Sequence, residues 1–127
     1  MAHNSWFLYA ATMRIFKHYH FNVKDPATAA TSLSFSSYAG YIESLDDYYQ
    51  LSSGLVMLQT TNLIYNLELY SLVRPQSLFA WQRVRVANMM ARSGSEWYYT
   101  VRMYNSGIFS FMLCGVILLN CTSYQLH

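Results

Sequence analysis

Charged side chains, glycine and proline are all scarce in this 127-residue sequence. Eight Lys and Arg stand against six Asp and Glu, which gives a formal net charge of +2. A nucleic-acid-binding domain usually carries a concentrated basic patch, whereas the cationic residues here are scattered, so we expect no nucleic-acid partner. The low charge and the hydrophobic content of 54% also exclude a disordered or collagen-like segment.

The short motifs that are typical of catalytic or metal-binding sites are missing as well. There is no Gly-rich phosphate loop, no His-Glu-x-x-His zinc helix and no Gly-x-Ser-x-Gly nucleophile elbow. Cys114 and Cys121 do not have the spacing of metal ligands, and no second cysteine pair accompanies them. We therefore expect no cofactor and no metal ion, and the spacing leaves open whether the two cysteines pair.

Signals for targeting are equally weak. The first residues show no basic stretch followed by an apolar core, so we expect no signal peptide on this chain. Residues 108–119 are almost purely apolar, but a bilayer-spanning helix needs about 20 such residues. A buried segment is the favoured interpretation, and a membrane span over residues 103–119 is the alternative. Asn120-Cys121-Thr122 is a formal glycosylation acceptor, which matters only in a secreted protein.

Aromatic residues, by contrast, are abundant. The chain has 12 Tyr, 7 Phe and 3 Trp, against a charged fraction of only 11%. So much aromatic surface with so little charge indicates a domain packed against something else, or a piece of a larger body.

The spacing of apolar residues predicts an amphipathic helix at the N-terminus. They recur every three or four positions, at Trp6, Tyr9, Met13, Phe16 and Tyr19. This period predicts a helix over residues 5–20. His18 and His20 would lie about 200° apart on such a helix, on different faces, and are interpreted as surface histidines.

The middle of the chain has the pattern of strands. Alternation over residues 33–37 predicts a short strand, and the apolar stretch within residues 51–61 predicts a second strand that pairs with it. A turn over residues 43–49 connects them. Asp46 and Asp47 are adjacent in this turn, where such a pair usually caps or is solvated.

Two helices are predicted next. Ser77 caps the first, with Trp81 and Val84 on one face, and it ends at Ser93-Gly94. Ser95 opens the second, whose buried edge is Trp97, Val101 and Tyr104. A final strand begins at residue 108. The predicted fold class is α+β, with too few strands to close a sheet of its own.

Residue chemistry alone suggests one candidate site, at the N-terminus. His3, Asn4, Ser5 and Trp6 cluster before the predicted helix, where donors can converge on an anion or oxyanion. A frayed helix start explains the same residues and is the favoured interpretation at this level.

Eight sequence blocks together resemble the phospholipase B-like family, in order and in register over residues 2–107. They are AHNSW at 2–6, MRIFK at 13–17, FSSYAG at 35–40, SLDDYY at 44–49, LSSGL at 51–55, QTTN at 59–62, WQRVRVANMMA at 81–91 and YNSG at 104–107. Many blocks in register are far more specific than any single motif.

The resemblance implies a fold, a reaction and a location. Members of that family are N-terminal nucleophile hydrolases with a four-layer αββα sandwich, found in lysosomes or secreted, that release fatty acids from phospholipids. A cysteine at a new N-terminus attacks the ester or amide carbonyl, and its α-amino group, with a pKa of about 8, accepts the proton. We accordingly expect a partial sandwich of this kind, a phospholipid or other acyl substrate, and the remainder of the sandwich as a partner.

The resemblance also assigns the site residues. His3 and Trp6 would line the site beside the cysteine, and Asn105 would donate an amide hydrogen bond to the oxyanion. Asn4 and Asp46 would have a structural role, or would position these residues without contacting the substrate.

Two departures from the family pattern limit what we expect of the chain alone. No cysteine precedes the AHNSW block, and the likeness stops at Gly107. We therefore expect residues 1–107 to be a fragment of the catalytic domain, inactive by itself, and residues 108–127 to be an atypical apolar tail from a truncated gene model or retained intron. The alternative is a non-catalytic lipid- or membrane-associated interaction protein that uses the tail.

Overall fold

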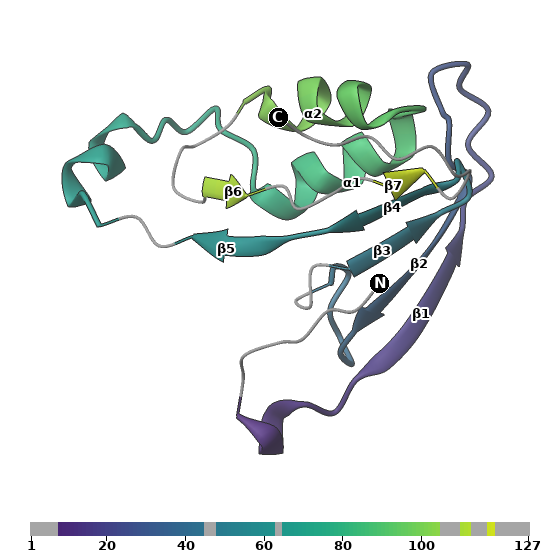
Figure 1. Ribbon diagram of the computed structural model, residues 1–127, viewed down its shortest axis with the longest axis horizontal. Helices are drawn as coiled ribbons and strands as arrows, with labels where there is room; N and C mark the ends of the chain where they lie inside the picture. Colours follow the sequence, from purple (N-terminus) through teal and green to yellow (C-terminus); the bar gives the residue numbers. More distant parts are fainter. Residues whose placement is uncertain (1–7, 45–47, 63–64, 105–109, 113–116, 119–127) are drawn as a thin grey trace.

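A computed structural model describes residues 8–44, 48–62, 65–104, 110–112 and 117–118. In these ranges a sheet is covered on one face by two helices (Figure 1). The elements run in the order η1 (Tyr9–Ala11), β1 (Ile15–His20), β2 (Ser32–Ser37), β3 (Tyr48–Leu51), β4 (Leu55–Leu58), β5 (Thr60–Asn62), η2 (Leu67–Leu72), α1 (Ala80–Met90), α2 (Gly94–Arg102), β6 (Ser110–Met112) and β7 (Ile117–Leu118).

The main sheet has five antiparallel strands in the order β1-β2-β3-β4-β7, and β5 pairs with β6 in a separate ribbon. Phe35 lies opposite Lys17 on one side and Tyr49 on the other, and Tyr49 lies opposite Met57. This register fixes which side chains share a face. The α+β class is confirmed, and the larger four-layer sandwich stays a prediction.

The predicted N-terminal helix is wrong over residues 15–20, which form strand β1. Within the described part of the predicted helix, residues 8–20, only Tyr9–Ala11 makes a helical turn. Apolar residues are so frequent here that they match a period of 3.6 as readily as a period of two. The β-branched and aromatic residues favour a strand, and pairing along the full length of β2 decides between the two.

Strand β2 confirms the predicted strand at residues 33–37 and adds Ser32. Its residues alternate between half-buried and buried, as a period of two requires. The single strand predicted over residues 51–61 is wrong, because the chain turns back after Leu51. Gly54 has a φ of +86° in this turn and donates to the Leu51 carbonyl at 3.1 Å, so β3 and β4 form a hairpin.

Helix α1 begins at Ala80 rather than directly after Ser77, and Gln82 Oε1 accepts from the Phe79 N–H at 3.1 Å. Helix α2 is capped by Ser93, whose hydroxyl accepts from the Glu96 N–H at 3.2 Å. The buried positions predicted at Trp97 and Val101 are confirmed. Tyr104 was predicted to be buried with them and is instead 68% exposed, because α2 ends at Arg102.

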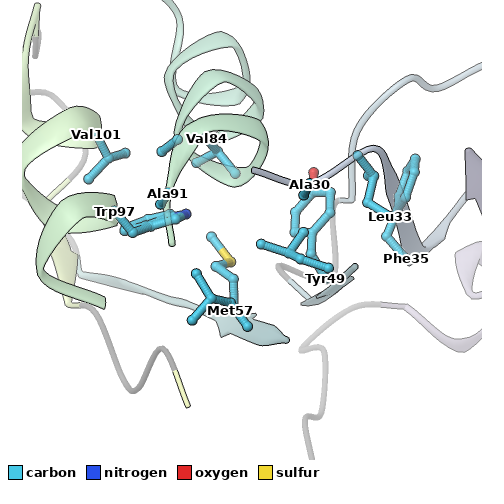
Figure 2. Packing of buried hydrophobic residues seen from close by; sticks show 12 residues of the cluster. Ala30, Leu33, Phe35, Tyr49, Met57, Val84, Ala91, Trp97 and Val101 are labelled. Atoms are coloured by element: carbon cyan, nitrogen blue, oxygen red, sulfur yellow. The ribbon is translucent and has the colours of Figure 1, made fainter. Parts of the chain in front are cut away.

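The core lies between the helices and the sheet (Figure 2). Trp97 is fully buried and its indole N–H donates to Asn88 Oδ1 at 2.7 Å. The Met89 carbonyl at the end of α1 accepts from the N–H groups of Ala29 and Ala30, at 2.7 and 3.0 Å, which ties the β1–β2 loop to the helix layer. The cluster is Ala30, Leu33, Phe35, Tyr49, Leu51, Leu55, Met57, Val84, Ala87, Ala91, Trp97 and Val101.

Candidate functional site

The residues that the sequence assigns to the site lie outside the described residues. They are His3, Trp6, Asn105, Asn4 and Asp46. Their roles therefore stay predictions. The structure does describe the segments that lead to two of them: the β2–β3 connection, defined here as residues 38–44, which precedes Asp46, and the end of α2, which precedes Asn105.

A lysine from β1 holds the start of the β2–β3 connection. Lys17 Nζ donates to the Tyr38 carbonyl at 2.7 Å and also to the Tyr41 carbonyl. Lys17 lies on the same side of the sheet as Phe35, its partner in the register. Hydrogen bonds from a charged donor are stronger than neutral ones, so this ammonium group restrains the backbone at two points.

Residues of β2 and β3 hold the end of the connection. The Ser37 hydroxyl donates to the Glu43 carbonyl at 2.6 Å, and the Ser44 N–H donates to the Tyr49 hydroxyl at 2.7 Å. The Tyr48 N–H in turn donates to the Ser44 hydroxyl at 3.3 Å. The chain is therefore anchored at Ser44 and at Tyr48, on either side of Asp46 in the sequence.

Arg85 from α1 completes this set of anchors. Its Nη2 donates to the Ile42 carbonyl at 2.5 Å. Its guanidinium carbon lies 5.4 Å from the ring centroid of Tyr19, 5.8 Å from that of Phe21 and 5.6 Å from that of Phe35. All three distances lie within the range of cation–π interactions. We call Lys17, Ser37, Tyr49 and Arg85 the connection anchors.

Glu43 is half-buried beside this group. Burial raises the pKa of its carboxyl above the ordinary value, and the nearby Arg85 charge partly opposes this shift. On α1, burial lowers the pKa of the neighbouring Arg83, whose Nη1 donates to the Val101 carbonyl at 2.7 Å. Burial of the charged form is the main cause of both shifts.

The segment before Asn105 has an unusual backbone. Tyr104 has a φ of 56°, in the left-handed region that is costly for a residue with a Cβ. Its carbonyl accepts from the Leu78 N–H at 3.2 Å, which joins the end of α2 to the segment before α1. On α2, Arg102 lies over the rings of Tyr98 and Tyr99, at 5.8 and 5.5 Å.

The two histidines of β1 do not lie on different faces, as the predicted helix required. Because residues 15–20 form a strand, His18 and His20 share one face instead of lying on different helix faces. Both are exposed, as expected of surface histidines. His18 Nδ1 lies 2.8 Å from the Ser34 hydroxyl across the β1–β2 ladder.

Neither a metal site nor a membrane-spanning helix is formed by the described residues. Among the described residues, no group of three or more His, Cys, Asp or Glu is placed to hold a metal ion. In that part of the chain no helix has both the length and the apolar character to cross a bilayer. Cys114 and Cys121 lie outside it.

Comparison with known proteins matches residues 1–113 to the family model for phospholipase B. The chain belongs to the phospholipase B family. It is 62% identical over 109 residues to phospholipase B-like 1 of Rattus norvegicus and 57% identical over the same length to that of Homo sapiens. It is 58% identical to phospholipase B of Crotalus adamanteus. Each match covers 86% of this chain and 20% of the relative.

The chain thus spans about one fifth of the length of these phospholipase B relatives. The matched range includes all five predicted site residues and all four connection anchors. Sequence patterns alone did not find the anchors, because residues 5–20 were predicted to be a helix and the contacts join segments that are distant in the sequence. Only the strand register reveals that Lys17 faces the connection.

Proposed function

We propose that this chain forms part of a hydrolase that cleaves ester or amide bonds of phospholipids and releases fatty acids. The observation that carries the proposal is the family match over residues 1–113, together with relatives named phospholipase B at 57–62% identity. The reaction involves a carbonyl that must be attacked and an oxyanion that must be stabilised.

The residues that we propose for this chemistry are those of the sequence resemblance. His3 and Trp6 line the site, and the Asn105 amide donates to the oxyanion. Removal of one such donor typically costs about 100- to 1,000-fold in kcat. Asn4 and Asp46 position these three residues. The connection anchors hold the backbone on either side of Asp46.

The nucleophile is proposed to come from the rest of the protein. The resemblance assigns it to a cysteine before the AHNSW block, and the 127 residues contain cysteine only at positions 114 and 121. We therefore propose that these residues alone release no fatty acid, and that their partner is the remainder of the hydrolase sandwich. A lysosomal or extracellular location is part of the same proposal.

The proposal is tested in a chimera. In it, the matched 109-residue segment of rat phospholipase B-like 1 is replaced by the corresponding residues of this chain. We expect the chimera to release fatty acid from phospholipid vesicles. Asn105→Ala should lower kcat by about 100-fold or more with little change in KM, whereas Asn22→Ala, in the exposed β1–β2 loop, should leave both unchanged.

The 127-residue chain is assayed beside the chimera. A folded chimera without hydrolysis would contradict the proposed function. Fatty acid release by the chain alone, lost in His3→Ala or Asn105→Ala, would instead contradict the proposed origin of the nucleophile.

A further inference from the structure

Strand β1 lies at one edge of the five-stranded sheet, and β7 lies at the other. β1 pairs with β2 over all six of its residues, and in the described part of the chain no strand pairs with its other side. An edge strand exposes a row of N–H and C=O groups that can pair with another strand.

The ladder shows which backbone groups point outward. Phe21 N–H donates to the Thr31 carbonyl at 2.8 Å, and directly opposed antiparallel pairs alternate between bonded and non-bonded. The odd-numbered residues of β1 therefore bond to β2. The backbone groups of Phe16, His18 and His20 point away from β2, toward the free edge. The bond of 2.9 Å from Ser52 N–H to the Ser32 carbonyl, on the other side of β2, fits the same alternation.

This edge lacks the usual protection against pairing. Soluble proteins block an edge with a short strand, proline, a bulge or an outward lysine. β1 has six residues in unbroken register and no proline. Its only lysine, Lys17, is engaged with the Tyr38 and Tyr41 carbonyls. Its exposed side chains include Ile15 and Phe16, which are 44% and 64% exposed, and Met13 just before the strand is 84% exposed.

We propose that the free edge of β1 pairs with a further strand supplied by the rest of the same hydrolase. This rests on the proposed function, in which the chain is one part of a larger sandwich. The length of the relatives favours this source for the added strand. The match covers 20% of the rat relative, so about four fifths of that protein lies outside it and can supply the strand. A strand here would bond the outward groups of Phe16, His18 and His20 and cover the apolar side chains beside them.

Hydrogen exchange of the outward amides tests the pairing directly. In the rat chimera, the amides of Phe16, His18 and His20 should exchange about 100-fold or more slowly than in the 127-residue chain. The amide of Asn22, in the adjoining loop, is the control and should exchange rapidly in both.

A matched pair of variants tests the same bond through stability. His18→Pro removes the outward N–H, and His18→Ala removes the side chain and its contact with Ser34 while keeping that N–H. The unfolding midpoint of the chimera should be lower for the proline variant than for the alanine variant. In the chain alone, this difference should be smaller. If the chimera does not fold, the two variants are made at the matched position of the rat protein itself.

Three other results of the exchange experiment would overturn the proposal. Unprotected amides in a folded chimera would show that no strand is added. Protection already present in the dilute 127-residue chain would assign the edge to this chain, and protection that rises with its concentration would assign it to a second copy. Hydrolysis is scored separately: a protected edge without hydrolysis contradicts only the proposed function, and hydrolysis with an unprotected edge contradicts only the added strand.

Discussion

The core beneath the helices and the N-terminal flank, defined as residues 8–16, use similar side chains in opposite ways. In the core, Phe35 and Trp97 are fully buried. In the flank, Tyr9 is 93% exposed and Phe16 is 64% exposed. The aromatic surplus of the sequence is therefore divided. One part stabilises the helix-covered sheet, and another is left on the surface, both beside the edge of β1 and elsewhere, as at Tyr65 and Phe79.

This difference separates the apolar side chains that stabilise the chain by itself from those that a partner surface could cover. A large apolar side chain contributes about 1.5–3 kcal/mol when it is fully buried. The core residues gain this within the described structure, whereas the flank gains it only when another surface covers it. Mutations in the two regions should therefore differ sharply in the chain alone.

The largest effect is expected in the core. Trp97→Ala should lower the free energy of unfolding by about 3–5 kcal/mol, because it leaves a cavity and removes the donor to Asn88. Tyr9→Ala in the flank should change it by less than about 0.5 kcal/mol. Urea denaturation followed by far-UV circular dichroism measures both. Similar losses for the two variants would mean that the flank is packed in the chain alone, and the comparison would fail.

An intermediate loss of stability is expected at Lys17, in strand β1 directly after the flank. Lys17→Met should cost about 1–3 kcal/mol, because the Tyr38 and Tyr41 carbonyls lose their charged donor. Lys24→Met, at an exposed loop position, is the matched control and should be nearly neutral. Equal denaturation midpoints for the two variants would show that Lys17 does not hold the β2–β3 connection.

The core and the flank also differ in how far the sequence predicts them. The strand at Ser32–Ser37 and the buried Trp97 and Val101 follow from local periodicity. β1 does not, because its period is ambiguous and its partner lies across a loop. The hairpin turn at Gly54 was missed because the apolar residues on either side looked like one continuous strand.

The candidate site also has a part that the sequence predicts and a part that only the structure reveals. Residue chemistry alone indicated the cluster at His3, Asn4 and Trp6, and the family resemblance supplied Asn105 and the roles of all the proposed residues. The connection anchors come from β1, β2, β3 and α1, and contacts between distant segments are invisible to a local pattern. Arg85 illustrates this, because the Ile42 carbonyl that it binds is 43 positions away in the sequence.

A smaller effect, of opposite sign, is expected at the end of α2. Tyr104→Gly should raise the free energy of unfolding by up to about 1 kcal/mol, since glycine adopts the left-handed conformation without steric cost. Met103→Gly is the control: this neighbour has an ordinary φ of −66°, so glycine there should be destabilising. Thermal unfolding of both variants separates the two signs. A destabilised Tyr104→Gly would mean that the exposed ring makes contacts that outweigh the backbone strain.

The smallest effect is expected at Glu43, a half-buried residue of the β2–β3 connection. Burial raises the pKa of this carboxyl in the folded state, so the folded protein binds the proton more tightly than the unfolded chain does. The resulting stabilisation is fully present below the ordinary carboxyl pKa and is lost as the pH rises through the raised value.

Glu43→Gln should therefore be slightly more stable than the parent chain at neutral pH, and this advantage should vanish at about pH 3, where both side chains are uncharged. Urea midpoints of the two proteins across this range measure the difference, and the acid points serve as the internal control. A variant that is less stable only at neutral pH would show that the attraction to Arg85 outweighs burial. Glu43 would then belong with the connection anchors as an ionised partner of Arg85, and the pKa of its carboxyl in the folded state would lie below the ordinary value.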